Sequence, residues 1–110
     1  MDINELISIV TLNQIEDNKF EGQNYNTVWG RIFGGQVLSQ SLHAAYQTVP
    51  EKRIAHSMHG YFILPGDLNE TVTYEVDNIR NGGSFTTRRV VAFQKGRAIF
   101  NMSASFQKDE

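Results

Sequence analysis

Two adjacent glycines, Gly34 and Gly35, stand before a strongly apolar segment in the stretch RIFGGQVLSQSLHAA at residues 31–45. A helix that begins at these glycines presents unpaired backbone N–H groups and the positive end of its dipole. Such a tip attracts an anion or the developing oxyanion of an acyl transfer, and residues without side chains let it approach closely. Alternatively, the glycines only allow a buried helix to start against a sheet. The local sequence leaves both interpretations open.

Two further polar residues could take part in chemistry near this tip. Gln36 follows the glycines and could hydrogen-bond a substrate carbonyl or a water, or merely cap the first turn. His56 could act as a general base or orient a ligand, or it could be a structural histidine bonded to the backbone. His59 lies three positions after His56 on an expected strand, which predicts opposite faces and argues against a shared metal site. No metal is therefore expected.

A third group of candidates follows a glycine turn. Ser84 and Phe85 come after Asn81-Gly82-Gly83, where an extended ligand could lie along exposed backbone, although a hairpin turn needs glycines anyway. Arg88 and Arg89 are adjacent, so that one faces inward and one outward. An outward-facing arginine beside a cleft could hold a phosphate through paired hydrogen bonds, and a solvated surface arginine is the alternative. We select Arg88 as the candidate.

The elements that must position these residues are read from periodicity. The spacing of apolar residues predicts a helix over 34–49, ended by Pro50, and a shorter helix over 2–12. Strands are predicted over 54–64, 71–80, 84–95 and 97–107, with a further candidate over 19–26. In the last strand, one face is expected in the core and consists of Ala98, Phe100, Met102, Ala104 and Phe106.

Short turns connect the predicted strands and fix the fold class. Lys95-Gly96 makes a tight hairpin, and Asn81-Gly82-Gly83 turns the preceding pair. Such connections imply antiparallel neighbours. The sequence therefore predicts one α+β domain over 1–110, in which a long buried helix is wrapped by a curved antiparallel sheet of five or six strands.

Composition excludes several classes of protein. The chain has 110 residues, 40% hydrophobic and 20% charged, with a formal net charge of -2 and no cysteine. These values predict a globular domain without disulfides, thiolate nucleophiles or Cys-containing zinc sites, and no nucleic-acid partner. No apolar run approaches the roughly 20 residues that cross a bilayer, and the segment MDINELISIV lacks the features of a secretory signal. We therefore expect a cytoplasmic protein with no membrane span.

Four segments carry a resemblance to a known family. They are FGGQ at 33–36, HSMHGYF at 56–62 running to PGD at 65–67, RNGGSF at 80–85 followed by RRV at 88–90, and IFNMSASFQ at 99–107. In order and spacing, this set resembles the N-terminal half of the acyl-CoA thioesterase II family and covers nearly the whole chain from Phe20 onward. The resemblance implies a hotdog fold, a long helix wrapped by an antiparallel sheet.

The resemblance also implies an activity: hydrolysis of fatty acyl-CoA to free fatty acid and coenzyme A, with no metal or other cofactor. The Gly35 amide would face the thioester oxygen, and an arginine such as Arg88 would hold a coenzyme A phosphate. Apolar residues such as Phe62 and Phe100 would be core residues or line an acyl tunnel.

Family members are double hotdogs whose Asp, Ser/Thr and Gln for positioning the attacking water lie in the second half. The 34–49 helix has no acidic residue, so the chain is expected to act with a second hotdog domain or as a homo-oligomer paired at its sheet edge. The alternative is a non-catalytic hotdog domain for dimerisation or acyl-group binding. A hotdog hydratase fits less well, because its paired histidine and carboxylate are not found on the helix.

Overall fold

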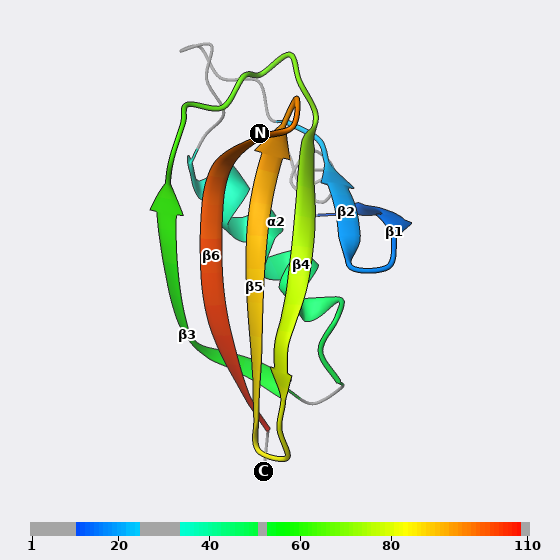
Figure 1. Ribbon diagram of the computed structural model, residues 1–110, viewed down its shortest axis with the longest axis vertical. Coiled ribbons are helices and arrows are strands. Elements are labelled where there is room, and N and C mark those ends of the chain that lie inside the picture. The colour runs from blue at the N-terminus through cyan, green and yellow to red at the C-terminus, as the bar shows by residue number, and fades with distance from the viewer. Residues whose placement is uncertain (1–10, 25–33, 51–52, 109–110) are drawn as a thin grey trace.

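Residues 11–24, 34–50 and 53–108 are described by the computed structural model. They form a six-stranded sheet in the order β1-β2-β4-β5-β6-β3, and every neighbouring pair is antiparallel. The strands are β1 (Asn13–Glu16), β2 (Lys19–Gly22), β3 (Arg53–Phe62), β4 (Val72–Asn81), β5 (Phe85–Gln94) and β6 (Arg97–Lys108). Figure 1 shows the long strands β3 to β6 curving together in front of the single described helix, α2 (Gly34–Tyr46).

The predicted strands over 54–64, 71–80, 84–95 and 97–107 are confirmed as β3 to β6, with ends shifted by one or two residues. The candidate over 19–26 is confirmed in part as β2, while β1 is a strand that the periodicity does not predict. The predicted helix over 2–12 lies outside the described residues apart from its last two positions, which are not helical.

Helix α2 begins at Gly34 as predicted, but it ends at Tyr46 rather than at position 49. The backbone then tightens into a turn in which the Thr48 amide donates to the carbonyl of Ala45 over 3.0 Å. The helix is not buried all round. The face that meets the sheet consists of Gln36, Val37, Gln40, Ser41, Ala44 and Ala45.

Two glutamines lie on this buried face because other buried groups satisfy their amides. Gln40 Nε2 donates to the backbone carbonyl of Gln23 over 2.8 Å, and the Tyr74 hydroxyl donates to Gln40 Oε1 over 2.5 Å. Gly22 makes room for this contact, since a Cβ there would lie 2.8 Å from Gln40 Cδ. Polar residues thus join the helix to the strands β2 and β4.

The sheet has an inner face, which contacts α2, and an outer face. Alternation along β5 and β6 confirms the two-residue period: Thr86, Arg88, Val90 and Ala92 of β5 are buried. On β6, four of the five predicted core residues are buried, namely Phe100, Met102, Ala104 and Phe106, whereas Ala98 is half-buried. Ile99 is also buried, because a bulge beside Phe93 shifts the register of the β5–β6 pair.

The predicted turns are confirmed. Lys95 and Gly96 have φ values of 50° and 73°, the left-handed conformation that a two-residue hairpin requires. At the other hairpin the Gly82 amide donates to the carbonyl of Phe85 over 2.8 Å. These short connections make the sheet antiparallel, and one helix packed against a curved antiparallel sheet is the hotdog fold.

Candidate functional site

An open cavity of about 330 Å³ reaches the first residue of α2. Its walls come from the start of the helix, from the end of β3 and the loop that follows, and from β6. The described residues that line it are Gly34, Val37, Phe62, Ile63, Leu64, Pro65, Gly66, Ile99 and Phe100. The lining is apolar apart from backbone groups, which suits a hydrocarbon chain bound with a polar group at its end.

Gly34 lies against an aromatic ring. A Cβ added at this glycine would lie 3.2 Å from Phe62 Cζ, so that a larger side chain would push into the space beside the ring. The Phe62 ring itself packs on Phe100, with centroids 4.8 Å apart and planes inclined by 44°. Aromatic surface therefore frames the helix tip, and the side-chain-free residue keeps that tip accessible.

The tip has the electrostatic character that the sequence predicts. The N–H groups of the first turn have no partner within the helix, and this turn contains no acidic residue. Gly35 is partly exposed in this turn, and Gln36 is buried, with only 3% of its surface exposed. The turn therefore presents backbone N–H groups and a positive dipole end at the cavity.

Gln36 is engaged in a network that ties the helix start to the loop between β3 and β4. Its Nε2 donates to Asn24 Oδ1 over 2.9 Å, and Asn24 Nδ2 donates to the carbonyls of Leu68 at 3.1 Å and Glu70 at 2.6 Å. These bonds give Gln36 a positioning role at the wall of the cavity.

A second network holds the same loop from the other side. Gln94 Oε1 accepts from the Asp67 amide over 2.8 Å, and Gln94 Nε2 donates to the carbonyls of Asp67 and Glu70. The amides of Ile63 and Leu64 both donate to the carbonyl of Ile99. The cavity wall that follows β3 is therefore fixed by side-chain and backbone hydrogen bonds, although it has no regular secondary structure.

The other candidate residues lie elsewhere. His56 is exposed on the outer face, where its Nε2 lies 2.8 Å from Ser105 Oγ and its ring centroid 5.5 Å from that of Phe85. Phe62 follows six positions later on β3, which at about 3.3 Å per residue is about 20 Å away. The structure therefore brings His56 together with Phe85, but not with Gly34.

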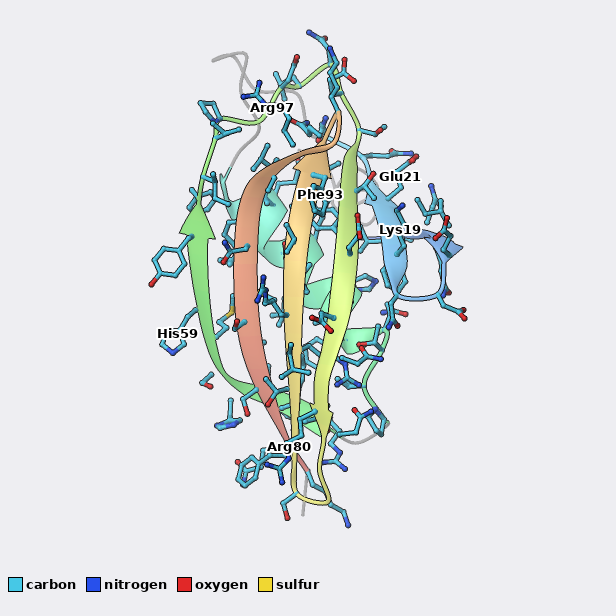
Figure 2. All side chains as sticks on the ribbon, viewed as in Figure 1. Lys19, Glu21, His59, Arg80, Phe93 and Arg97 are labelled. Atoms are coloured by element: carbon cyan, nitrogen blue, oxygen red, sulfur yellow. The ribbon has the colours of Figure 1, made fainter. Side chains whose placement is uncertain are left out.

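Ser84 lies in the turn between β4 and β5 and Phe85 begins β5, at the end of the sheet where Figure 2 shows Arg80. Much of their backbone is already bonded: the Ser84 carbonyl accepts from the Lys108 amide over 2.9 Å, and the Phe85 carbonyl accepts from Gly82. Phe85 is 48% exposed. These residues offer an exposed aromatic surface rather than free backbone groups.

The expectation that His56 and His59 point to opposite faces is wrong. A bulge between Ala55 and Ser57 resets the alternation of β3, so that His56 reaches Ser105 on the outer face. His59 pairs with Ser103 and points away from the sheet in Figure 2. No group of three metal-ligating side chains occurs among residues 11–24, 34–50 and 53–108.

Arg88 is the inward-facing member of the arginine pair, with 1% of its surface exposed. Its Nε donates to Thr48 Oγ1 over 2.7 Å, and its Nη2 donates to the Thr48 carbonyl over 2.9 Å and to Asn81 Oδ1 over 2.6 Å. Its Nη1 donates to the carbonyls of Arg80 and Thr87. The guanidinium thus joins the end of the helix to the β4–β5 turn, and a coenzyme A phosphate would have to displace these bonds.

Within the described part of the chain, no carboxylate forms a salt bridge with Arg88, so the buried charge is compensated by neutral acceptors. Burial lowers the pKa of its guanidinium, because desolvation disfavours the charged form. A cation beside the last turn of α2 also interacts favourably with the negative end of the helix dipole. Arg88 thus stabilises the C-terminal end of α2, while the N-terminal end at Gly34 lines the cavity.

Sequence reasoning missed the loop residues Ile63, Leu64 and Pro65 as part of the cavity wall. The signal available was the apolar run from Tyr61 to Leu64, which continues past the observed end of β3 at Phe62 and stops at Pro65-Gly66. Tyr61 and Phe62 are 71% and 64% exposed, an unusual fraction for large apolar side chains. Exposed apolar runs of this kind are typical of surfaces that contact a ligand or another protein unit.

Comparison with known proteins places this geometry in a family. The profile of the acyl-CoA thioesterase N-terminal domain matches residues 23–107. Acyl-CoA thioesterase 2 of Haemophilus influenzae is 41% identical over 108 residues, which cover 98% of this chain and 38% of that protein. Acyl-coenzyme A thioesterase 8 of Mus musculus is 41% identical over 102 residues, which cover 92% of this chain and 32% of that protein. The chain thus spans about a third of the length of these relatives.

Solved structures support the same family assignment. An acyl-CoA thioesterase II, TesB2, from Mycobacterium marinum superposes with a TM-score of 0.86 at 42% identity, covering 96% of this chain and 39% of that chain. A tesB protein from Mycobacterium avium subs. paratuberculosis superposes with a TM-score of 0.91 at 31% identity, covering 96% and 43%. No helix in the described ranges has the length and apolarity that crossing a membrane requires. By sequence and by fold, the chain belongs to the acyl-CoA thioesterase family and matches its N-terminal domain.

Proposed function

We propose that this chain is the N-terminal hotdog unit of an acyl-CoA thioesterase, which hydrolyses fatty acyl-CoA to free fatty acid and coenzyme A. The single observation that carries the proposal is the apolar cavity of about 330 Å³ that ends at Gly34. Membership of the family supports the choice of substrate. We also propose that residues 1–110 form one hotdog domain, and a cytoplasmic location stays a prediction from the sequence.

In the proposed complex the acyl chain lies against Val37, Ile99 and Phe100, and its thioester carbonyl faces the first turn of α2. Water attacks the carbonyl carbon, the carbonyl oxygen becomes an oxyanion, and the C–S bond then breaks as the thiol of coenzyme A leaves with a proton. Backbone N–H groups at Gly34 and Gly35 would hydrogen-bond the oxyanion as it forms. One donor of this kind typically lowers an acyl-transfer barrier by about 3 kcal/mol.

The base that activates the water is proposed to come from a second hotdog unit. Among the described residues that line the cavity, none carries a carboxylate or an imidazole. Gln36 lies near this turn, but its amide is engaged with Asn24, so we propose that it positions the helix rather than the water. The cavity alone thus supplies binding and oxyanion stabilisation, without a group that removes the proton.

We propose that the second unit docks at the free edge of β3. Within residues 11–24, 34–50 and 53–108, this strand ends the sheet and pairs with β6 alone, so that one edge of its ten residues has no partner strand in these ranges. Such edges are normally covered, and the exposed Tyr61 and Phe62 at its end supply apolar surface for an interface. A second copy of this chain or a second hotdog domain fits this edge equally well.

Antiparallel pairing would also explain why the candidate residues fall into two groups. If β3 pairs antiparallel with the equivalent strand of a second unit, the start of one strand lies beside the end of the other. The helix of the second unit begins at that end. His56, Ser84 and Phe85 would then lie near the site of the second unit rather than near Gly34. We propose that His56 serves as a base or a ligand-orienting group across this pairing.

Thiol release tests the proposed activity. The purified 110-residue protein is incubated with medium-chain and long-chain acyl-CoA while the free thiol is measured. Gly34→Val should abolish turnover, because the added atoms occupy the space beside Phe62, whereas Gly83→Val should not, because a Cβ at Gly83 meets no atom within 4 Å. Circular dichroism confirms that both variants fold.

The alternative, a non-catalytic hotdog domain, makes a different prediction for the same assay. Binding of acyl-CoA without any thiol release, by the chain alone and in the presence of a second hotdog domain, would favour the alternative and refute hydrolysis. Pairing is tested separately by size-exclusion chromatography with light scattering. We expect a mass of at least a dimer, and a monomer at all concentrations would contradict docking at the β3 edge.

A further inference from the structure

A groove of about 150 Å³ adjoins the cavity that reaches Gly34. The two share Leu64, Pro65 and Ile99 in their walls. The rest of the groove is polar, with walls from the β3–β4 loop and from the hairpin between β5 and β6. Its other described residues are Asp67, Glu70, Gln94, Lys95 and Arg97.

The hairpin holds its two cations at a fixed place. Lys95 and Gly96 adopt the left-handed conformation of a tight turn, and Arg97 begins β6 directly afterwards. Figure 2 shows Arg97 at the end of the sheet where the β3–β4 loop passes, opposite the end that carries Arg80. The loop opposite the hairpin is fixed by the buried Gln94, whose amide bonds both Asp67 and Glu70. The groove therefore has two anchored walls.

The charges in the groove are not all paired. Lys95 Nζ lies 3.1 Å from Glu70 Oε1, and Asp67 Oδ1 accepts from the Asn69 amide over 2.9 Å. Arg97 is exposed and forms no salt bridge with any other residue of the described ranges. An exposed guanidinium is suited to a phosphate, because its planar fork makes two parallel hydrogen bonds to phosphate oxygens.

We infer that this groove binds the phosphate groups of coenzyme A, with Arg97 as the main anchor and Lys95 as a second cation. The inference rests on the proposed function, because it places the acyl chain of the substrate in the adjoining cavity. The polar end of the substrate then leaves the helix tip over Leu64 and Pro65 and reaches the hairpin. Arg97 thus takes the role that the sequence analysis gave to Arg88, whose guanidinium is occupied inside the fold.

The test compares ligands with and without phosphates. Titration calorimetry measures the binding of coenzyme A and of pantetheine to the wild type, to Arg97→Gln and to Arg89→Gln. Arg89 is a matched control, since it is an exposed arginine of β5 outside the groove. Arg97→Gln should weaken coenzyme A binding about tenfold and leave pantetheine binding unchanged. Arg89→Gln should change neither.

The salt dependence gives a second readout. Raising the ionic strength should weaken coenzyme A binding by the wild type more steeply than by Arg97→Gln, because screening acts on the exposed ion pair. Equal affinity of the wild type and Arg97→Gln for coenzyme A would overturn the inference. The inference would also be overturned if Arg97→Gln weakened pantetheine binding as much as coenzyme A binding, or if the wild type did not bind coenzyme A.

An acyl-pantetheine thioester separates this inference from the proposed function, because it offers the same reacting bond without phosphates. Binding or hydrolysis of acyl-pantetheine, together with equal coenzyme A affinity in the wild type and Arg97→Gln, would refute the phosphate groove alone. Failure to bind or hydrolyse both acyl-pantetheine and acyl-CoA would refute the proposed function itself.

Discussion

Replacing Arg88 tests whether a buried cation without a carboxylate partner stabilises this fold. The guanidinium donates five hydrogen bonds to Thr48, Arg80, Asn81 and Thr87. Arg88→Met keeps an unbranched apolar side chain but leaves the carbonyl of Thr48 and the amide oxygen of Asn81 without this donor. Breaking a buried charged network in this way typically costs about 3–5 kcal/mol, because the remaining groups stay desolvated.

That cost is a large part of the stability of a small domain, which is about 5–15 kcal/mol. At about 4 °C per kcal/mol, Arg88→Met should lower the melting temperature by about 12–20 °C. Arg88→Lys should show a smaller loss, because an ammonium keeps the charge but cannot reproduce the planar fork. Urea denaturation followed by circular dichroism measures the free energy of unfolding of each variant.

Arg89→Met is the matched control, because Arg89 is the neighbouring residue on the same strand but is exposed. Its free energy of unfolding should stay within about 0.5 kcal/mol of the wild type. If Arg88→Met and Arg89→Met unfold at the same urea concentration, the buried hydrogen bonds do not stabilise the fold and the structural role of Arg88 is refuted.

Three further perturbations follow from other contacts. Gly60→Ala should lower the free energy of unfolding by about 1–3 kcal/mol, since its Cβ would lie 2.7 Å from the Phe100 ring, whereas Gly83→Ala should have little effect in the same urea assay. Burial lowers the pKa of His43 below its usual value of 6.5, so the unfolded chain binds a proton more readily than the folded state. The free energy of unfolding should therefore fall as the pH drops below 6.5 through the folded-state pKa. His43→Gln should flatten this dependence in a pH series of thermal melts. Gln94→Leu removes three hydrogen bonds to the loop before β4 and should speed amide exchange in that loop, and unchanged exchange would contradict its role as an anchor.

Much of the fold follows from spacing along the chain. The alternation of β5 and β6 and the two hairpins are local properties, because successive side chains of a strand leave opposite faces and glycine tolerates the turn conformation. The start of α2 at Gly34 is also predicted, but its end is not, since Gln47 and Thr48 form a turn that Arg88 holds. The strand β1 escaped prediction because its pattern is exposed throughout and lacks an apolar alternation.

The candidate site was predicted in part. The glycines and the absence of acidic residues in the first turn indicate a helix tip open to an anion, and the structure places a cavity at Gly34. The sequence analysis places His56 near this tip. In the structure, the bulge turns His56 to the outer face, and most of the length of β3 lies between His56 and the cavity. The loop walls from Ile63 onward could not be found, because their position depends on bonds to Ile99 and to distant glutamines.

The sequence by itself determined the types of the longer elements, α2 and β3 to β6, together with the hairpins, the family and a helix tip that bears no acidic side chain. Only the tertiary structure decided which arginine is buried, on which face His56 lies and which loop closes the cavity. The physical reason is that local spacing sets side-chain direction only where the strand pairing is regular. Contacts such as Arg88 with Thr48, forty residues apart, depend on how the helix settles on the sheet.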